Sequence, residues 1–357
     1  MSNYQPNAAQ QLATEVNQLQ ASVNSLQDDI RMAKERDAMA TIDNTIDGLP
    51  QKILDLRTRG YPFENDLESA AANLKQRWTS QRLLVLQQIT QQATGLDMDM
   101  RQLELGMSGL ESRSYNPAIA QPYLSQVKAQ LSALQSKVSA AQGMVSNMIR
   151  PFTDDENKLT SHLSDLDWML TQLSQATFQL LPTEGGIMAV KATWCRSGKE
   201  SKDDPQGVLY LTDQRVIFEQ KQEIATKKVL FVATEKQMVQ KLQLEAPVAL
   251  ATTIKGTKQG LFGHEDHLDV SFAVGAPVAN AHFHLNGQDC NAWQGLLNRA
   301  KTKDFDKGRA VAVDQAEVEK VKTAPTQCPV CGGAITKPVL RGMDSITCEY
   351  CGNVIRL

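Results

Sequence analysis

The chain has 357 residues, of which 41% are hydrophobic and 22% charged, and its formal net charge is −3 at pH 7. This length predicts two or three domains, and the composition is typical of a globular protein rather than a disordered or fibrous one. The slightly negative charge argues against a nonspecific nucleic-acid binder, because such a protein needs a strong positive excess to neutralise phosphates.

The sequence contains no run of eighteen apolar residues and no basic and then apolar leader after Met1. It therefore predicts neither a membrane span nor a secretory signal. Only Cys195 and Cys290 lie outside a C-terminal cysteine group, which fits a reducing compartment. We expect a cytoplasmic protein, with a peripheral position at the inner face of the membrane as the alternative.

Residues 10–180 are rich in Gln, Ala, Leu and Ser, and their apolar residues recur in alternating steps of four and three. A mean step of about 3.5 residues keeps one seam of a helix facing a partner helix. Proline and glycine predict helix breaks near residues 48–50, 60–62, 116–117 and 150–151. We therefore predict for residues 1–182 an antiparallel coiled coil or helical bundle through which the chain self-associates. The first run of seam positions is Leu12, Val16, Leu19, Val23, Leu26, Ile30 and Ala33.

From residue 183 the apolar period changes from that of helices to that of strands. The stretch "GVLYLTDQRVIFEQ" predicts a β-hairpin with its turn at residues 212–214. A helix should close this region, with Asp289 as its N-cap and an apolar stripe of Trp293, Leu296 and Leu297. Further strands are predicted at residues 189–195, 228–232, 249–254, 268–273 and 281–285. The pattern predicts a small β-barrel with a capping helix over residues 183–303.

The hairpin "LYLTDQRVIF" resembles the hairpin of GRAM and bacterial pleckstrin-homology-like (PH-like) domains, in which a preceding glycine and an aromatic residue of the last helix recur, as Gly207 and Trp293 do here. The resemblance implies a PH-like domain that binds phosphoinositides, other lipid surfaces or protein segments and that rarely catalyses a reaction. The loop "RSGKESKDDPQG" balances its basic residues with acidic ones, which disfavours anionic lipid there. A basic rim of Lys227, Lys228, Lys255 and Lys258 is the alternative lipid or anion site.

The tail contains Cys328-x2-Cys331 and Cys348-x2-Cys351, separated by sixteen residues, and a glycine follows each pair. This spacing predicts one four-thiolate Zn²⁺ site, which has no open position for a substrate and is therefore structural. A disulfide pair or a redox-active CxxC is the alternative interpretation. Residues 327–357 look like a zinc ribbon, and residues 304–326 are predicted to be its linker.

Residues that could support other chemistry are few. The sequence lacks the usual phosphate-binding, nucleophile-elbow and HExxH motifs, so we predict no enzymatic activity. His264, His267, His282 and His284 lie close together in sequence and permit a second metal site, but a polar turn that contains the first two is the better explanation. Cys195 and Cys290 are predicted to be small buried residues rather than nucleophiles.

The sequence as a whole predicts a multidomain α + β protein. We interpret it as a non-enzymatic cytoplasmic adaptor or scaffold, with a coiled coil for self-association and PH-like and zinc-ribbon modules that dock protein partners. The alternative is a peripheral membrane-remodelling stress scaffold whose PH-like domain contacts lipid, because the helical half is loosely similar in composition to phage-shock-type coiled coils. Nucleic acid is the least favoured partner.

Overall fold

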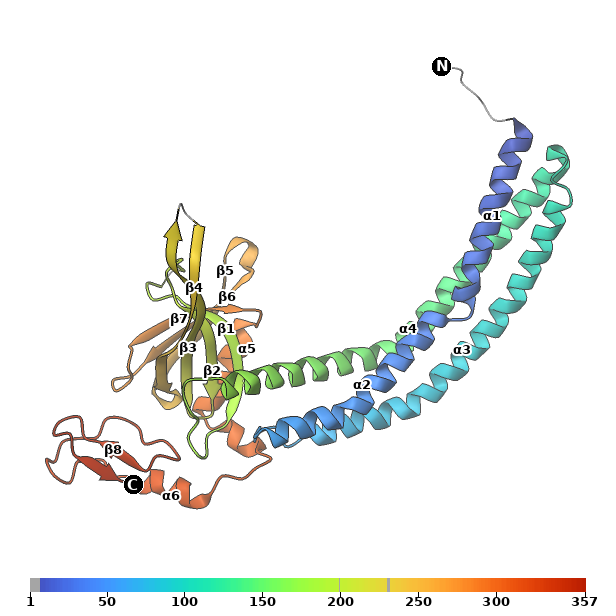
Figure 1. The fold of residues 1–357 in the computed structure, drawn as a ribbon. Helices are drawn as coiled ribbons and strands as arrows, with labels where there is room; N and C mark the ends of the chain where they lie inside the picture. Colours follow the sequence, from blue (N-terminus) through green and yellow to red (C-terminus); the bar gives the residue numbers. More distant parts are fainter. Residues whose placement is uncertain (1–6, 199, 230–231) are drawn as a thin grey trace. The chain divides into compact units, whose positions relative to one another are not determined.

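The computed structural model describes residues 7–198, 200–229 and 232–357, except for the side chains of residues 224–236. The chain forms two compact units, each built from two separate stretches of sequence (Figure 1). The first unit comprises Met1–Pro50 with Ser69–Thr160, and the second comprises Gln51–Glu68 with Ser161–Leu357. No helix among the described residues is both long and apolar enough to cross a membrane.

Four helices, α1 (Ala8–Ile30), α2 (Ala33–Thr58), α3 (Leu67–Glu111) and α4 (Pro117–Ser174), form a bundle that makes up the first unit. The end of α2 after Pro50, the first two residues of α3 and the end of α4 after Thr160 belong to the second unit. Two contacts of Trp78 in α3 show how the helices pack. Its indole Nε1 donates to Asp43 of α2 at 2.7 Å, and its ring lies 5.2 Å from that of Phe152 in α4. Lys137 of α4 pairs with Asp99 of α3 at 2.7 Å. Polar contacts therefore join α3 to both neighbouring helices.

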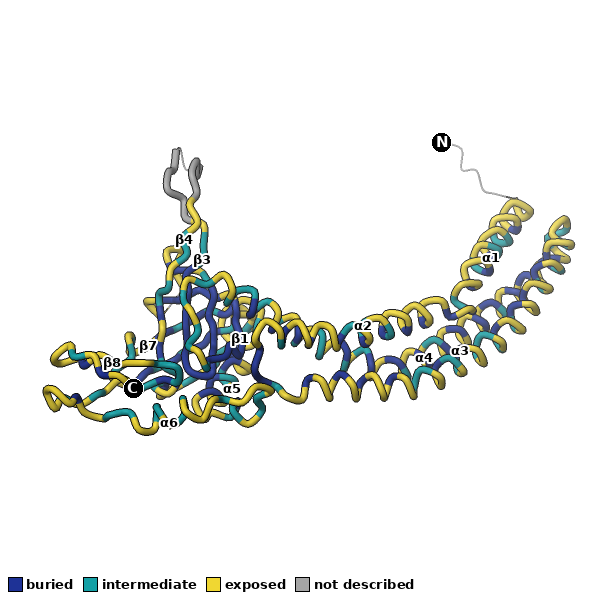
Figure 2. Tube along the Cα trace, turned by 60° about the horizontal axis from the view of Figure 1, so that its bottom comes forward, coloured by how far each residue is buried: buried dark blue, intermediate teal, exposed yellow. Residues whose placement is uncertain are grey.

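The predicted seam positions are largely buried, and Figure 2 shows the buried residues recurring along the helices. Val16 is only half-buried. Ala33 is exposed, because α1 ends at Ile30 and a new helix begins at Ala33. Residues of the seams that are buried include Leu12, Leu19, Val23, Leu26, Ile30, Leu67, Leu74, Trp78, Leu96, Leu103, Leu110, Leu124, Leu131, Leu134, Val138, Val145, Leu163 and Leu166. The 3–4 spacing thus predicted the packed faces of these helices.

Two of the predicted helix breaks are wrong, because Pro50 lies inside α2 and Pro151 lies inside α4. A proline inside a helix removes one backbone hydrogen bond and costs about 3 kcal/mol. Leu49 and Ile53 beside Pro50 are fully buried, so packing on both sides of the proline offsets that cost. The break that the sequence did not predict falls at Met32, a fully buried residue with a φ of 56°.

The second unit is built around an antiparallel sheet of seven strands in the order β4-β3-β2-β1-β7-β6-β5. The two edge strands β4 and β5 do not pair with each other, so among the described residues the predicted barrel-like domain is hydrogen-bonded as an open sheet. The strands are β1 (Gly186–Trp194), β2 (Gln206–Thr212), β3 (Arg215–Val229), β4 (Val232–Pro247), β5 (Ala251–Gln259), β6 (Glu265–Phe272) and β7 (Asn280–Asn286).

The predicted hairpin is confirmed as β2 and β3, and Gly207 has a clear packing role in it. A Cβ at this position would lie 1.9 Å from the carbonyl oxygen of Glu219, so only glycine allows β2 to approach β3 here. The aromatic rings of Trp194, Phe218 and Phe283 meet in the core of the domain. The predicted strand at residues 228–232 includes residues 230 and 231, which lie outside the described residues.

Helix α5 (Cys290–Lys301) follows β7 and packs against β5 and β6. Its predicted N-cap is confirmed, because the Asp289 side chain accepts hydrogen bonds from the amides of Asn291 and Ala292. Trp293 and Leu297 are buried, as predicted, and Leu296 is half-buried. The helix is therefore anchored by its apolar stripe.

The chain then continues through the short helix η3 (Asp304–Gly308), helix α6 (Gln315–Thr323) and the two-stranded sheet of β8 (Ser345–Thr347) and β9 (Val354–Arg356). The turn between α2 and α3 belongs to the same unit. There the Phe63 ring lies 5.8 Å from that of Phe305, and the amide of Ala310 donates to the Pro62 carbonyl at 2.8 Å. The segment Gln51–Glu68, which includes the turn between α2 and α3, thus belongs to the β unit although it lies early in the chain.

Candidate metal centre and its attachment to the β domain

The four tail cysteines converge on one point, as their spacing predicted. The donor atoms of Cys328, Cys331, Cys348 and Cys351 all lie within 4.8 Å of one another. Two of the Sγ–Sγ distances are 3.7 Å and 3.6 Å. A tetrahedron of thiolates with metal–sulfur bonds of about 2.3 Å has sulfurs about 3.8 Å apart, so the cluster has the size needed to hold a metal ion.

Each CxxC pair is shaped by a tight turn that ends at a glycine in the left-handed region. Gly332 has a φ of 72° and Gly352 a φ of 73°, values that glycine adopts without a steric penalty. The amides of these glycines donate to the carbonyls of Cys328 and Cys348, each at 2.9 Å. The two pairs therefore form similar knuckles that direct their sulfurs toward each other.

The backbone amides of these knuckles also favour ionised sulfur. Amides of Cys331 and Val330 lower the pKa of the Cys328 thiol to about 7, and amides of Cys351 and Tyr350 lower that of Cys348. The Asn353 amide acts on Cys351 in the same direction, but hydrogen bonds with the other thiols outweigh it and raise the pKa of Cys351 to about 12. The Cys351 thiol therefore loses its proton readily only when a cation binds among the four sulfurs.

The module around the cluster has little other core. One buried cluster consists of Cys328, Cys348 and Ile355, with Ile335 and Ile346 packed against it, and Leu340 is buried besides. So small a core buries too little apolar surface to stabilise a fold of this length by itself. A bound metal would therefore contribute much of the folding free energy of the module.

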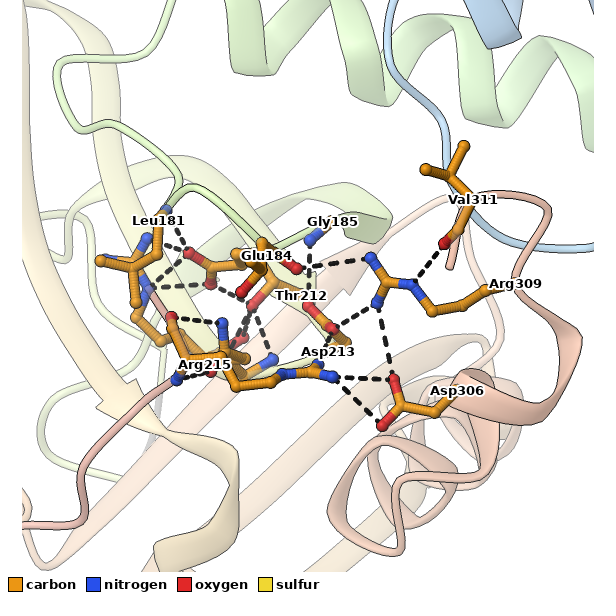
Figure 3. A network of polar contacts seen from close by, with 12 residues as sticks. Leu181, Glu184, Gly185, Thr212, Asp213, Arg215, Asp306, Arg309 and Val311 are labelled. Atoms are coloured by element: carbon orange, nitrogen blue, oxygen red, sulfur yellow. Dashed lines mark hydrogen bonds and ion pairs between the residues drawn. The ribbon is translucent and has the colours of Figure 1, made fainter. Parts of the chain in front are cut away.

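An ion-pair network attaches this module to the turn between β2 and β3 (Figure 3). Asp213 lies in that turn, and its carboxylate accepts hydrogen bonds from Arg341 of the module and, at 2.8 Å, from Arg309 of the preceding segment. Asp306 of η3 lies 3.3 Å from Arg341 and 3.5 Å from Arg309. The side chains of Asp213, Arg309 and Arg341 are 4%, 7% and 13% exposed, so this network is shielded from water.

Two further contacts fix the same turn. Gln214 accepts from the Arg341 amide at 2.6 Å and donates to the Arg341 carbonyl at 3.1 Å. Burial raises the pKa of Asp213, while the Gly185 amide and the two arginines act in the opposite direction. Burial is therefore the largest influence on the pKa of this carboxyl, and the two arginines offset only part of it.

Sequence reasoning did not find this network, because its members come from the hairpin, the predicted linker and the tail. Asp213 belongs to the hairpin motif "LTDQR", but nothing in that motif identifies its two partners. A second buried pair lies in the same hairpin, where Arg215 Nε donates to Glu184 at 2.8 Å and Arg215 Nη1 donates to Glu245 at 2.6 Å. Arg215 and Glu184, whose side chains are 5% and 0% exposed, are thus paired with each other.

The four lysines of the predicted basic rim differ in how far the structure describes them and in their pairing. The side chains of Lys227 and Lys228 lie outside the described residues. The ammonium of Lys258 pairs with Asp266 at 2.6 Å and with Asp289 at 2.8 Å. Lys255 is exposed and has no ion pair with the described residues. The rim stays a prediction, and in the described part Lys258 is already neutralised.

Three of the four histidines come together on β6 and β7. The ring of His267 stacks on those of His282 and His284 at centroid distances of 5.0 Å and 4.7 Å. His282 Nδ1 lies 2.6 Å from Asp269, and His284 Nδ1 lies 2.6 Å from Glu200. Each of the three rings therefore has at least one nitrogen with a partner within the chain, and the tail cysteines form the one metal-binding group among the described residues.

Cys195 and Cys290 are buried, as predicted. Burial raises the pKa of Cys195 to about 11 and also raises that of Cys290. Both thiols are therefore protonated near neutral pH, which is the state of an unreactive core cysteine.

Comparison with known proteins gives the following similarities. No family model and no curated protein matches the chain. Among solved structures, the Vps36 N-terminal PH domain is similar with a TM-score of 0.23 and 13% identity, over 35% of this chain and 84% of that one. The PDZ-RhoGEF DH/PH domains in complex with GTP-gamma-S activated RhoA are similar with a TM-score of 0.25 and 12% identity, over 84% of this chain and 96% of that one. These TM-scores are too low to support an argument from similarity. The β domain is therefore described by the strand order of its own sheet.

Proposed function

We propose that this protein is a non-enzymatic adaptor, in which a self-associating helical bundle carries a PH-like β domain and a zinc ribbon that together dock protein partners. The observation that carries the proposal is the network of Asp213, Arg309 and Arg341, which joins the β2–β3 turn to the cysteine module. Two small modules that share a buried ion-pair network can present one composite surface. A partner that contacts both gains affinity from their fixed spacing.

The ion of the cysteine module is proposed to be Zn²⁺. Four thiolates at tetrahedral spacing suit Zn²⁺, which has no geometric preference from d electrons and is usually four-coordinate in structural sites. All four coordination positions would be taken by sulfur, so the ion would fix the two knuckles and leave no position for a substrate.

A groove on the cysteine module supports docking of a protein segment. Its volume is about 260 Å³, and Ile335, Pro338, Met343 and Ile346 supply its apolar lining. Lys337 and Glu349 lie at the same groove and pair with each other at 3.0 Å. An apolar hollow with a balanced pair of charges fits one apolar side chain of a partner segment better than it fits a phosphate.

Partner capture by the full metal-loaded chain tests this proposal. Partners retained by the wild type should be lost from the groove variant Ile346→Glu and weakened in Arg341→Ala, which loosens the attachment of the module. Lys301→Ala, at an exposed position at the end of α5, is the matched control and should retain them. If every partner is retained equally by all three variants, the composite surface is not the docking site.

A further inference from the structure

The turn between β5 and β6 presents two large apolar side chains to solvent. This tip, residues 260–263, has the sequence Gly-Leu-Phe-Gly and forms the short helix η2 at the end of the hairpin (Figure 1). Leu261 is 81% exposed and Phe262 is 87% exposed. Neither side chain contributes to the core of the β domain, so packing within the chain does not explain their presence.

The backbone of the tip is strained at the aromatic residue. Phe262 has φ 63° and ψ 18°, which is the left-handed region that bulky residues rarely occupy. Gly260 and Gly263 on either side also have positive φ, and a Cβ on Gly260 would lie 2.5 Å from the carboxyl carbon of Glu265. The backbone conformation of Phe262 is strained and its exposed ring is unfavourably solvated. This combination points to contact between Phe262 and another molecule.

The stem below the tip has no excess of positive charge, because Lys255 and Lys258 share the β5–β6 hairpin with Glu265, Asp266 and Asp269. Lys258 pairs with Asp266 and Asp289, and Lys255 stands opposite Asp269 in the register of β5 and β6. The tip is therefore an apolar point on a stem without a net positive field. Its attraction for a partner must be mainly apolar.

The shape and size of the tip distinguish the possible partners. A stable protein interface needs about 800 Å² from each side, whereas two side chains of this size offer about 400 Å² at most. A convex tip would also need a preformed pocket in a protein partner. A bilayer needs none, because its interfacial region accommodates apolar side chains that enter from a protein surface.

We propose that the Leu261–Phe262 tip inserts into the interfacial region of a lipid bilayer. Insertion places the two side chains among the acyl chains near the headgroups, while the paired charges of the stem stay in the hydrated layer. Since the stem has no excess of positive charge, binding does not require anionic lipid and is not abolished by salt. This membrane contact goes beyond the proposed protein adaptor function and does not depend on the cysteine module.

Vesicle binding by the full metal-loaded chain tests the proposal. The wild type should co-sediment with phosphatidylcholine vesicles and to a similar extent with mixed phosphatidylcholine and phosphatidylserine vesicles. The double variant Leu261→Ser, Phe262→Ser should bind at least about tenfold more weakly, because each buried apolar side chain contributes about that much. The control Val274→Ser removes an apolar side chain that is 90% exposed on another loop and should bind as the wild type does.

A tryptophan at the tip reports insertion directly. In Phe262→Trp, brominated phosphatidylcholine should quench more emission than in the wild type, whose own tryptophans give the background. Equal quenching in the two proteins overturns the proposal, as does the absence of binding to either vesicle or full retention by the double variant. Binding restricted to phosphatidylserine vesicles and abolished by salt would instead identify a basic surface. Loss of self-association by the double variant without vesicles would identify a contact between copies, and it too overturns the proposal.

Discussion

Replacement of Arg341 by alanine should loosen the attachment of the cysteine module to the β domain. The change removes the charged hydrogen bond to Asp213 and two contacts of 3.3 Å to Asp306. Hydrogen bonds to charged groups contribute about 1.5 to 3 kcal/mol, and the Arg341 side chain is only 13% exposed, so solvent screens it little. Asp213 retains Arg309 and the Gly185 amide, so it does not become an unpaired buried charge.

We therefore expect the attachment to weaken by about 2 kcal/mol, which corresponds to about a 30-fold shift in its equilibrium. Hydrogen exchange of the metal-loaded protein measures this shift at the amide of residue 341, which donates to Gln214 of the β2–β3 turn at 2.6 Å. Metal stoichiometry should stay unchanged, which separates detachment of the module from its unfolding. The exposed residue Arg356 in β9 provides the matched control Arg356→Ala.

Unchanged exchange in Arg341→Ala would refute the argument and would leave the backbone contacts of Gln214 as the attachment. The double variant gives a second test. If Asp213 is the main partner, Arg341→Ala should have little further effect in a protein that already carries Asp213→Asn. Equal effects in both backgrounds would mean that Arg341 acts through Asp306 instead.

The other predictions concern the metal, the bundle and pH. Cys328→Ser should release the metal and make residues 327–357 sensitive to protease while the helical bundle still melts cooperatively, as metal analysis and circular dichroism would show; stoichiometric retention of the metal counts against the four-thiolate site. Leu131→Glu places a charge at a position that is 7% exposed and should lower the unfolding free energy of the bundle by several kcal/mol, roughly 3 or more, whereas Ser132→Glu on the exposed face should not. The hydrogen bond to Glu64 raises the pKa of His162, so its stabilising effect is fully present below about pH 6.5 and is lost as pH rises through the raised value. Urea unfolding at pH 6 and pH 9 should therefore differ less in His162→Gln than in the wild type, and an unchanged difference would contradict the assignment.

The sequence predicted those features that depend on local patterns. The 3–4 spacing identified the buried faces of the helices, and an apolar run followed by a polar turn and a second strand-like run identified the β2–β3 hairpin. The doubled CxxC spacing identified the four sulfurs, because knuckle geometry is local and each pair is followed by a glycine. The N-cap at Asp289 was found for the same reason, since the cap and its amides are adjacent in sequence.

Features that depend on distant parts of the chain were not predictable. Pro50 and Pro151 are tolerated because neighbouring apolar residues are buried against other helices, which the local proline signal does not contain. β4 was missed because its sequence, "VATEKQMVQKLQLEAP", is polar, as suits an edge strand. The partners of Asp213 lie about one hundred residues away, and no pattern links them.

The interleaved construction of the β unit has a consequence for its synthesis on the ribosome. Tyr61 and Phe63 are fully buried, and a Cβ on Gly185 would lie 2.5 Å from the Pro62 ring. Gln51–Glu68 emerges more than ninety residues before the strands with which it forms a unit. Its aromatic residues therefore stay exposed to solvent until β1 and the segment around Phe305 have been translated. A fragment that begins at residue 183 lacks Tyr61 and Phe63, so the surface around Gly185 and Phe305 that they bury would stay exposed.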